Sequence, residues 1–208
     1  MSLELWISFF IASTALLAIP GPTVMIVISC ALASGRRSGW ATVPGVTLGD
    51  FTAMTVSLLG AGAILAASAN LFTAMKIVGA LYLIWLGIKL WRTGGKLGDL
   101  KGAQKGQSMW AMFRTSYVVT ALNPKSIVFF IAFVPQFVDV SQPVGLQFVI
   151  LEATFLAGAA INVIIWAALA GQLRARFSKP GTLRIVNKIG ASFLIGAGLL
   201  TAFVRRTA

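Results

Sequence analysis

The stretch Ala18-Ile19-Pro20-Gly21-Pro22-Thr23 lies between two segments, Leu5–Leu17 and Val24–Ala33, that are nearly all apolar. Proline lacks the N–H for the hydrogen bond to the residue four positions earlier, and its ring clashes with the preceding helical turn. Two prolines around one glycine therefore break a helix. Because the flanking segments are apolar, we expect a membrane-spanning helix that is broken near mid-depth. Non-helical backbone at that depth occurs only where it is buried in protein or lines a wet cavity.

A second apolar run is interrupted about a hundred residues later by Ala121-Leu122-Asn123-Pro124-Lys125-Ser126. Hydrophobic segments that are interrupted at corresponding positions of two halves indicate the binding site of a secondary transporter. We therefore expect the substrate and ion pathway to include six residues of the two breaks. They are Pro20, Gly21, Pro22, Asn123, Pro124 and Lys125.

The breaks also predict which backbone groups face the substrate. Pro20 and Pro22 release carbonyl groups near Leu16 and Ala18, and Pro124 releases one near Thr120. A freed carbonyl accepts a hydrogen bond from an ammonium group. Freed amides at the start of a half-helix donate to a carboxylate, with the helix dipole adding to the attraction. A zwitterionic amino acid needs both kinds of partner, so two facing breaks suit it.

The composition is that of a membrane protein. Of the 208 residues, 58% are hydrophobic and only 11% are charged, whereas a soluble domain carries roughly 25% charged residues. The net charge of +12 comes from basic residues in short segments between apolar runs. That distribution is typical of positive-inside topology and does not indicate a nucleic-acid partner. The single cysteine, Cys30, excludes an intramolecular disulfide.

Six apolar runs reach the roughly 20 residues that a membrane helix requires. Their expected ranges are 4–33, 40–69, 71–92, 110–138, 144–171 and 185–204. The first is too long for a signal peptide and should remain as a span. Asn70 marks a tight turn, and the glycines and lysines of residues 93–109 predict a flexible linker. We therefore predict an all-α, polytopic integral membrane protein that forms one transporter domain, residues 1–208.

Basic residues concentrate around the segments that follow the first, third and fifth runs. They are Arg36, Arg37, Lys89, Arg92, Lys96, Lys101, Lys105, Arg114, Arg174, Arg176, Lys179, Arg184 and Lys188. The opposite side holds only Lys76, Arg205 and Arg206. The positive-inside rule puts the linker 93–109 in the cytoplasm and both termini outside. The Arg205-Arg206 pair argues for the alternative of five spans.

The third and sixth runs share a pattern at a fixed offset of 111 positions. Gly79-Ala80-Leu81 aligns with Gly190-Ala191-Ser192, and Gly87 aligns with Gly198. The two broken helices align at an offset near 103. A repeat of three spans crosses the membrane an odd number of times, so its second copy must be inverted. We expect two inverted three-helix repeats, residues 1–92 and 110–204, with helices 1 and 4 broken.

Several motifs together resemble the lysine exporter and homoserine/threonine resistance family, often called LysE/RhtB. They are Pro20-Gly21-Pro22, Gly45-x-x-x-Gly49-Asp50, Gly79-Ala80-Leu81-Tyr82-Leu83 with Leu86-Gly87, Asn123-Pro124-Lys125 and Pro135-Gln136-Phe137. The likeness covers almost the whole chain. It implies export of amino acids or related metabolites from the cytoplasm, in exchange for protons. It also implies the cytoplasmic (inner) membrane of a bacterium.

Asp50 lies about ten residues into the second run, ~15 Å from its start and near the bilayer centre. A charge at that depth costs roughly 2.5–3.5 kcal/mol on insertion scales, so such residues mark transport pathways or proton relays. The alternative is a structural ion pair with Lys125. Lys125 in turn either binds a substrate carboxylate or neutralises Asp50.

Four further residues are secondary candidates. Glu152 lies near the outer end of the fifth run. It either faces water at the rim of the membrane or takes part in a proton relay. Asn162, like Asn123, is expected to hydrogen-bond between helices, with a contact to substrate as the alternative. Gly45 and Gly49 are small enough to permit close helix packing, including packing in a homo-oligomer.

Neither an enzyme activity nor a cofactor or metal site is expected. The chain has no histidine. Gly94-Gly95-Lys96-Leu97 lacks the upstream glycine and the following Ser/Thr of a phosphate loop. Gly190-Ala191-Ser192-Phe193-Leu194 lacks the closing glycine of a nucleophile elbow. Without a nucleotide site, active transport must draw on an ion gradient or on the gradient of the substrate.

We therefore predict a secondary active exporter of a small zwitterionic metabolite, a neutral or basic amino acid, that works by proton antiport. Its partners are the lipid bilayer, the amino-acid-like substrate and protons. The alternative is an uncoupled channel or a membrane scaffold. A channel does not need a lone acid beside a broken helix, and a scaffold needs neither feature.

Overall fold

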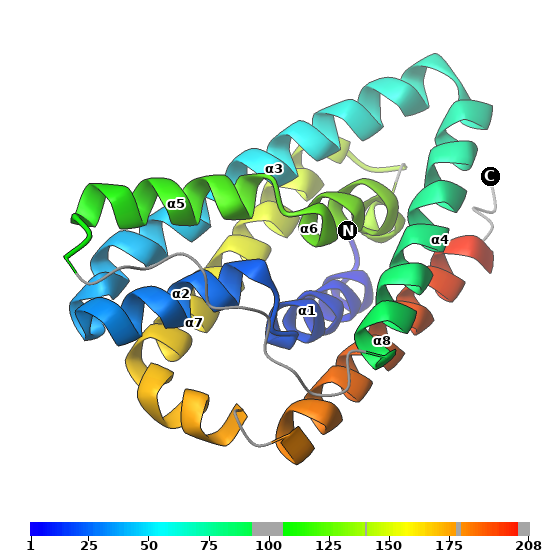
Figure 1. The fold of residues 1–208 in the computed structure, drawn as a ribbon. Helices are drawn as coiled ribbons and strands as arrows, with labels where there is room; N and C mark the ends of the chain where they lie inside the picture. The colour runs from blue at the N-terminus through cyan, green and yellow to red at the C-terminus, as the bar shows by residue number, and fades with distance from the viewer. Residues whose placement is uncertain (93–105, 140, 178–179, 204–208) are drawn as a thin grey trace.

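The computed structural model describes residues 1–92, 106–139, 141–177 and 180–203, and every regular element in them is a helix (Figure 1). The elements are α1 (Leu3–Ala18), α2 (Pro22–Ser34), η1 (Arg36–Ser38), α3 (Gly39–Ala67), α4 (Ala69–Arg92), α5 (Met109–Ala121), α6 (Pro124–Val128), η2 (Phe129–Phe133), η3 (Val134–Phe137), α7 (Val144–Phe177) and α8 (Pro180–Phe203). Of the three short elements, η1 and η3 are 3-10 turns and η2 is a π-helical turn.

Four helical stretches of the described residues are long and apolar enough to cross a membrane. They are Arg36–Ile64, Thr73–Arg92, Met109–Phe137 and Val144–Ala170. The bent pair α1 and α2 adds a fifth if it forms one span. The prediction of an all-α protein with several membrane spans is thereby confirmed. The predicted sixth run coincides with α8, which is not among these candidates.

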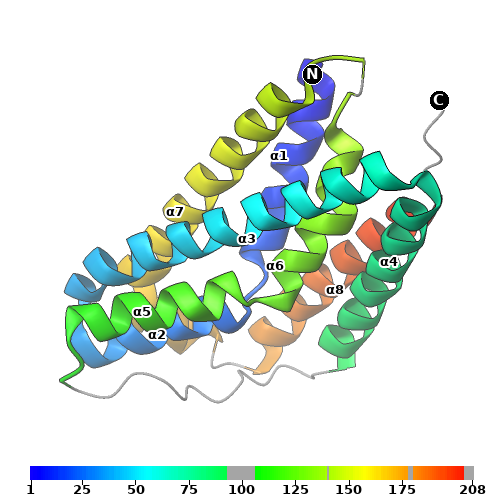
Figure 2. The same cartoon turned by 90° about the horizontal axis from the view of Figure 1, so that it is seen from above.

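The helix ends divide between two opposite sides of the molecule. In Figure 2, the ends of α2, α4 and α7 and the start of α5 lie along the lower edge. The N-terminus, the α3–α4 turn, the turn before α7 and the end of α8 lie in the upper part. The lower side is the one that the basic residues predict to be cytoplasmic. Most of the predicted linker (93–105), Lys179 and the Arg205-Arg206 pair lie outside the described residues.

Small residues let the helices approach each other closely. α4 packs along α8, and α3 packs along α5 and α7. A Cβ on Gly87 would lie 2.9 Å from the carbonyl oxygen of Ala191, and one on Gly198 would lie 2.7 Å from that of Ala80. Because residue numbers rise along α4 as they fall along α8 at these contacts, the two helices are antiparallel. Such close contacts are typical of helix packing in membranes.

Two predicted turns differ from the structure. The turn after α3 lies at Ser68, not at Asn70, because Ser68 is extended (φ −164°, ψ 117°) and its Oγ accepts a hydrogen bond from Leu71 N at 3.2 Å. Serine is a favoured residue at the start of a helix, so Asn70 belongs to the first turn of α4. α7 also continues beyond the predicted end at 171, so Arg174 and Arg176 belong to a helix rather than a loop.

Candidate functional site

The first break lies between α1 and α2, and the chain bends there by 53°. α1 ends at Ala18, after which Ile19 is extended (φ −72°, ψ 114°). Gly21 is also extended, and Pro22 is the first residue of α2. Proline is favoured at this position because the first helical residue has no N–H partner to lose. The break predicted at Pro20-Gly21-Pro22 is therefore confirmed.

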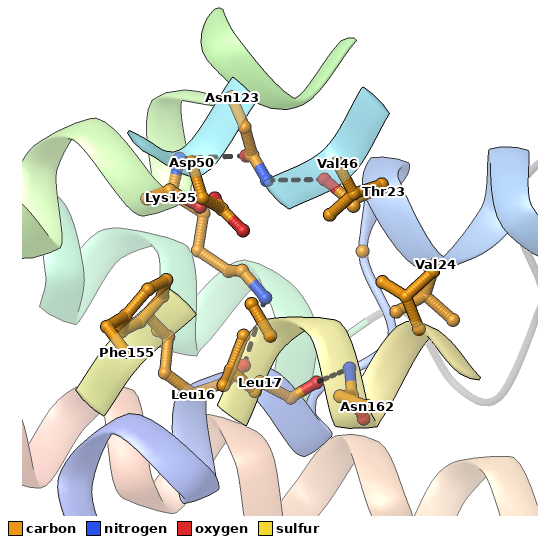
Figure 3. Close-up of a pocket in the computed structure, with 14 residues that line it drawn as sticks. Leu16, Leu17, Thr23, Val24, Val46, Asp50, Asn123, Lys125, Phe155 and Asn162 are labelled. Carbon is orange, nitrogen blue, oxygen red and sulfur yellow. Dashed lines mark hydrogen bonds between the residues drawn. The ribbon is translucent and has the colours of Figure 1, made fainter. Parts of the chain in front are cut away.

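Three carbonyl groups near the end of α1 accept hydrogen bonds from side chains of distant segments, and Figure 3 draws those of Leu16 and Leu17. Lys125 Nζ on α6 donates to the carbonyl oxygens of Leu16 and Ile19, each at 3.1 Å. Asn162 Nδ2 on α7 donates to the carbonyl oxygen of Leu17 at 3.1 Å. The prolines predict free carbonyls near Leu16 and Ala18; the carbonyls that take side-chain donors are those of Leu16, Leu17 and Ile19, and Leu16 O also accepts from Ile19 N at 3.3 Å. In this conformation two side chains satisfy them.

The second break separates α5 from α6 at Leu122 and Asn123. Asn123 starts the new helix: its Oδ1 accepts from Lys125 N at 3.1 Å. Its Nδ2 donates to Thr23 Oγ1 at 3.3 Å, and Thr120 Oγ1 donates to the same oxygen at 3.2 Å. These bonds tie the second break to the start of α2. The two breaks, which are far apart in the sequence, therefore meet.

A cavity of about 30 Å³ lies where the breaks meet. Fourteen residues from both breaks, α3 and α7 line it, and Figure 3 draws them as sticks. This volume suffices for water, whereas pockets for small ligands have roughly 300–1,000 Å³. Its apolar lining residues belong to two buried clusters, Leu16, Phe155 and Ala159 to one and Val24, Val46 and Val163 to the other. The cavity must therefore widen to admit an amino acid.

Asp50 on α3 lines this cavity and is only 3% exposed. Within the described part of the chain, no hydrogen bond or ion pair reaches its carboxylate. The structural ion pair with Lys125 that the sequence left open is thus not formed in this conformation. Lys125 lines the same cavity but donates to carbonyl groups of the first break instead.

The start of α2 leaves two amide groups without a partner in the helix. No side chain caps this end of α2, and Met25 N is the first amide of the helix to bond, to Gly21 O at 2.9 Å. The amides of Thr23 and Val24 therefore have no partner within the helix, and both residues line the cavity. The positive end of a helix dipole and unpaired N–H groups favour a carboxylate.

A family model described as LysE type translocator matches residues 14–204. The chain belongs to this family. It is 32% identical to a homoserine/homoserine lactone efflux protein of Salmonella typhi over 205 residues, which are 99% of either chain. It is also 32% identical to an uncharacterized membrane protein of Vibrio cholerae over 202 residues, 97% of this chain and 98% of the relative.

A leucine efflux protein of Klebsiella pneumoniae is 28% identical over 190 residues, 91% of this chain and 88% of the relative. No solved structure matches the chain. The resemblance to LysE-type exporters is therefore confirmed, as is a bacterial-type, multi-pass membrane protein. The LysE family consists of translocators, which move a solute across a membrane rather than convert it.

The structure places the secondary candidates of this LysE-family chain in different surroundings. Gly45 and Gly49 face α5, because a Cβ on either would lie 2.7–2.8 Å from a backbone oxygen of that helix. Asn162 lines the cavity and holds the break in α1. Glu152 is not among the lining residues; its Oε1 accepts a hydrogen bond from Thr55 Oγ1 at 2.6 Å, which joins α7 to α3.

Nine of the fourteen lining residues are not among the site residues that the sequence predicts, and Thr23 and Phe155 are two examples. Thr23 accepts two of the hydrogen bonds that join the breaks, and its place directly after Pro22, at the start of a half-helix, is a usable signal. Phe155 is an apolar residue within a long apolar run, so the sequence gives no signal for it.

A larger groove lies on another face of the molecule. It has a volume of about 520 Å³ and is lined by residues of α3, α4, α5, α6 and η2, most of them apolar. Thr52, Ser57 and Tyr117 are its polar residues, and no charged side chain lines it. It therefore lacks the two opposite charges, those of Asp50 and Lys125, that distinguish the smaller cavity.

Proposed function

We propose that this LysE-family translocator exports amino acids or closely related small metabolites from the bacterial cytoplasm, across the cytoplasmic membrane, by proton antiport. The observation that carries the proposal is the meeting of two broken helices at a buried cavity that holds one carboxylate and one ammonium group. Relatives named as homoserine/homoserine lactone and leucine efflux proteins support a substrate of this class.

The cavity offers a partner for each part of an amino acid. The amides of Thr23 and Val24 suit a carboxylate, and the carbonyls of the first break suit an ammonium group. Val46 and Phe155 supply an apolar wall for a neutral side chain. Binding in this pose requires the cavity to expand, since its present volume of about 30 Å³ admits only water.

Asp50 is the proposed proton carrier. It is the one carboxylate among the described residues that line the cavity, and none of those residues forms a hydrogen bond or ion pair that would hold it in the charged form. An intramembrane acid of this kind is a functional residue by default. Protons that enter from outside would bind Asp50, and their release into the cytoplasm would drive export.

The architecture that we propose is six spans in two inverted repeats, residues 1–92 and 110–204. Gly87 packs against Ala191 and Ile195, and Gly198 packs against Ala80 and Ile84. Gly87 and Gly198 are 111 positions apart, and so are Ala80 and Ala191 and also Ile84 and Ile195. The two contacts are therefore equivalent, as a two-fold axis between α4 and α8 requires. Inverted repeats with broken helices typically bind substrate near the membrane midplane.

The test is efflux from liposomes that contain the purified protein. The lumen holds a mixture of the common L-amino acids and L-homoserine, and the outside is made acidic by about one pH unit. We expect one or a few amino acids to leave faster than from protein-free liposomes, with saturation and with proton entry. Efflux without saturation or proton movement would indicate a channel. No efflux of any amino acid would overturn the proposal.

A further inference from the structure

Lys125 occupies the place at which a substrate's ammonium group would bind. Its Nζ donates to the carbonyl oxygens of Leu16 and Ile19, each at 3.1 Å. Leu16 O also accepts from Ile19 N at 3.3 Å, and Leu16 lines the same cavity as Thr23 and Val24 at the uncapped start of α2. Gly21 lies next to the lysine, since a Cβ there would be 3.5 Å from Nζ, an ordinary van der Waals contact. The side chain thus acts as a built-in primary ammonium in the empty site.

The same cavity contains a second acceptor for this cation. The Asp50 carboxylate lines it, and no described residue donates a hydrogen bond to that carboxylate. Opposite charges in a low-dielectric interior attract strongly. Lys125 therefore has two alternative partners, a pair of carbonyl groups and a carboxylate, and in this structure it holds the carbonyl groups.

We propose that Lys125 is a placeholder for the ammonium group of the substrate: it occupies the Leu16 and Ile19 carbonyls in the empty carrier and turns to Asp50 when an amine-bearing substrate takes them. The inference rests on the proposed export of amino acids and deepens it. It restricts the substrates to molecules with a cationic amino group. It also makes Lys125 a latch between the halves of the chain, because α6 holds the break in α1 only while the site is empty.

The placeholder explains how substrate and proton exclude each other. A protonated Asp50 is neutral and does not attract Lys125, so Lys125 stays bonded to the carbonyls of Leu16 and Ile19 and excludes the substrate. A deprotonated Asp50 attracts Lys125, which leaves the carbonyls of Leu16 and Ile19 available to the substrate. Two ligands that weaken each other's binding reciprocally are what antiport requires. Among the described residues, Asp50 and Lys125 are the charged residues that line the cavity; Glu4 is exposed on α1, and Glu152 is bonded to Thr55.

The test compares substrate binding to the purified wild type and to Lys125→Met. The probes are L-leucine, L-homoserine and the other common L-amino acids, together with 3-methylbutylamine, which lacks the carboxylate, and 4-methylpentanoate, which lacks the amine. Removal of the placeholder should lower the Kd of the bound amino acid and of the amine by about tenfold, because no ammonium must be displaced. The Kd of the acid should not change. Lys188→Met, on α8 beside Trp91, is the matched control.

The opposite sign would overturn the inference. If Lys125 binds the substrate carboxylate, the methionine variant will bind amino acids and 4-methylpentanoate more weakly. Asp50→Asn provides a second test that leaves Lys125 in place. We expect its amino-acid Kd to rise by about tenfold, because the lysine has lost its other partner; an unchanged or lower Kd would contradict the placeholder. If the wild type binds no amino acid at all, the proposed function itself fails.

Discussion

Asp50→Asn should uncouple export from the proton gradient without unfolding the protein. Asparagine has the shape of aspartate, and no hydrogen bond to Asp50 is lost among the described residues. The substitution creates no cavity and breaks no hydrogen-bond network, two of the common causes of large destabilisation. The variant should therefore insert and purify like the wild type, as size-exclusion chromatography and thermal unfolding can show.

The expected loss of coupling follows from one carboxylate that carries one proton. A gradient of one pH unit stores about 1.4 kcal/mol per proton, which supports a concentration ratio of about ten. The assay starts with equal amino-acid concentrations inside and outside liposomes, with the outside acidic by about one unit and the membrane potential clamped at zero. The final outside-to-inside ratio should be about ten for the wild type and about one for Asp50→Asn.

Asp139→Asn is the matched control for this experiment. Asp139 lies in the exposed turn before α7, and hydrogen bonds from the hydroxyl and N–H of Ser141 hold the pKa of its carboxyl below the usual value. The group stays charged near neutral pH and carries no proton, so this variant should keep a ratio of about ten. A ratio of about ten for Asp50→Asn would remove Asp50 from the mechanism and refute the reasoning.

Three further predictions concern packing, the break and topology. Gly49→Ala should destabilise the protein by about 1–3 kcal/mol in thermal or denaturant unfolding, because its Cβ would lie 2.8 Å from atoms of α5; Gly60→Ala on the same helix meets nothing within 4 Å and should not. Replacing both prolines of Pro20-Gly21-Pro22 with alanine should leave insertion intact, since alanine favours helix, but raise KM or abolish export; a wild-type rate would make the break a packing feature. A cysteine at residue 97 should react with an impermeant label only from the cytoplasmic side and one at 141 only from outside, and the reverse would overturn the charge-based topology.

The breaks could be predicted from the sequence because the effect of proline on a helix is local. Pro22 and Pro124 each start a helix in the structure, as their missing N–H groups dictate. Asp50 was equally visible, since one carboxylate in a long apolar run has a large insertion cost. These features need no knowledge of the tertiary structure.

The partner of Lys125 could not be predicted in the same way. Charge alone pairs it with Asp50, but the carbonyls of Leu16 and Ile19 become available only through the bend between α1 and α2 and the packing of α6 beside it. The role of Gly49 likewise depends on which helix its small face meets. Contacts between segments about a hundred residues apart carry no local signal.

Helix ends were predicted well where glycine or proline marks them and less well elsewhere. Gly35 and Pro22 bound α2 as expected. The helix α7 continues to Phe177, because arginines prevent entry into lipid but do not end a helix in water. Charge therefore indicates where the membrane ends and not where the helix ends.

A structure of the protein with its exported amino acid bound would test the central claim, that substrate binds between the two breaks, most directly. We predict density for the amino acid in an enlarged cavity, its carboxylate at the amides of Thr23 and Val24, and Lys125 Nζ no longer bonded to the carbonyls of Leu16 and Ile19. Density in the apolar groove of about 520 Å³ instead, with both lysine hydrogen bonds intact, would contradict the account.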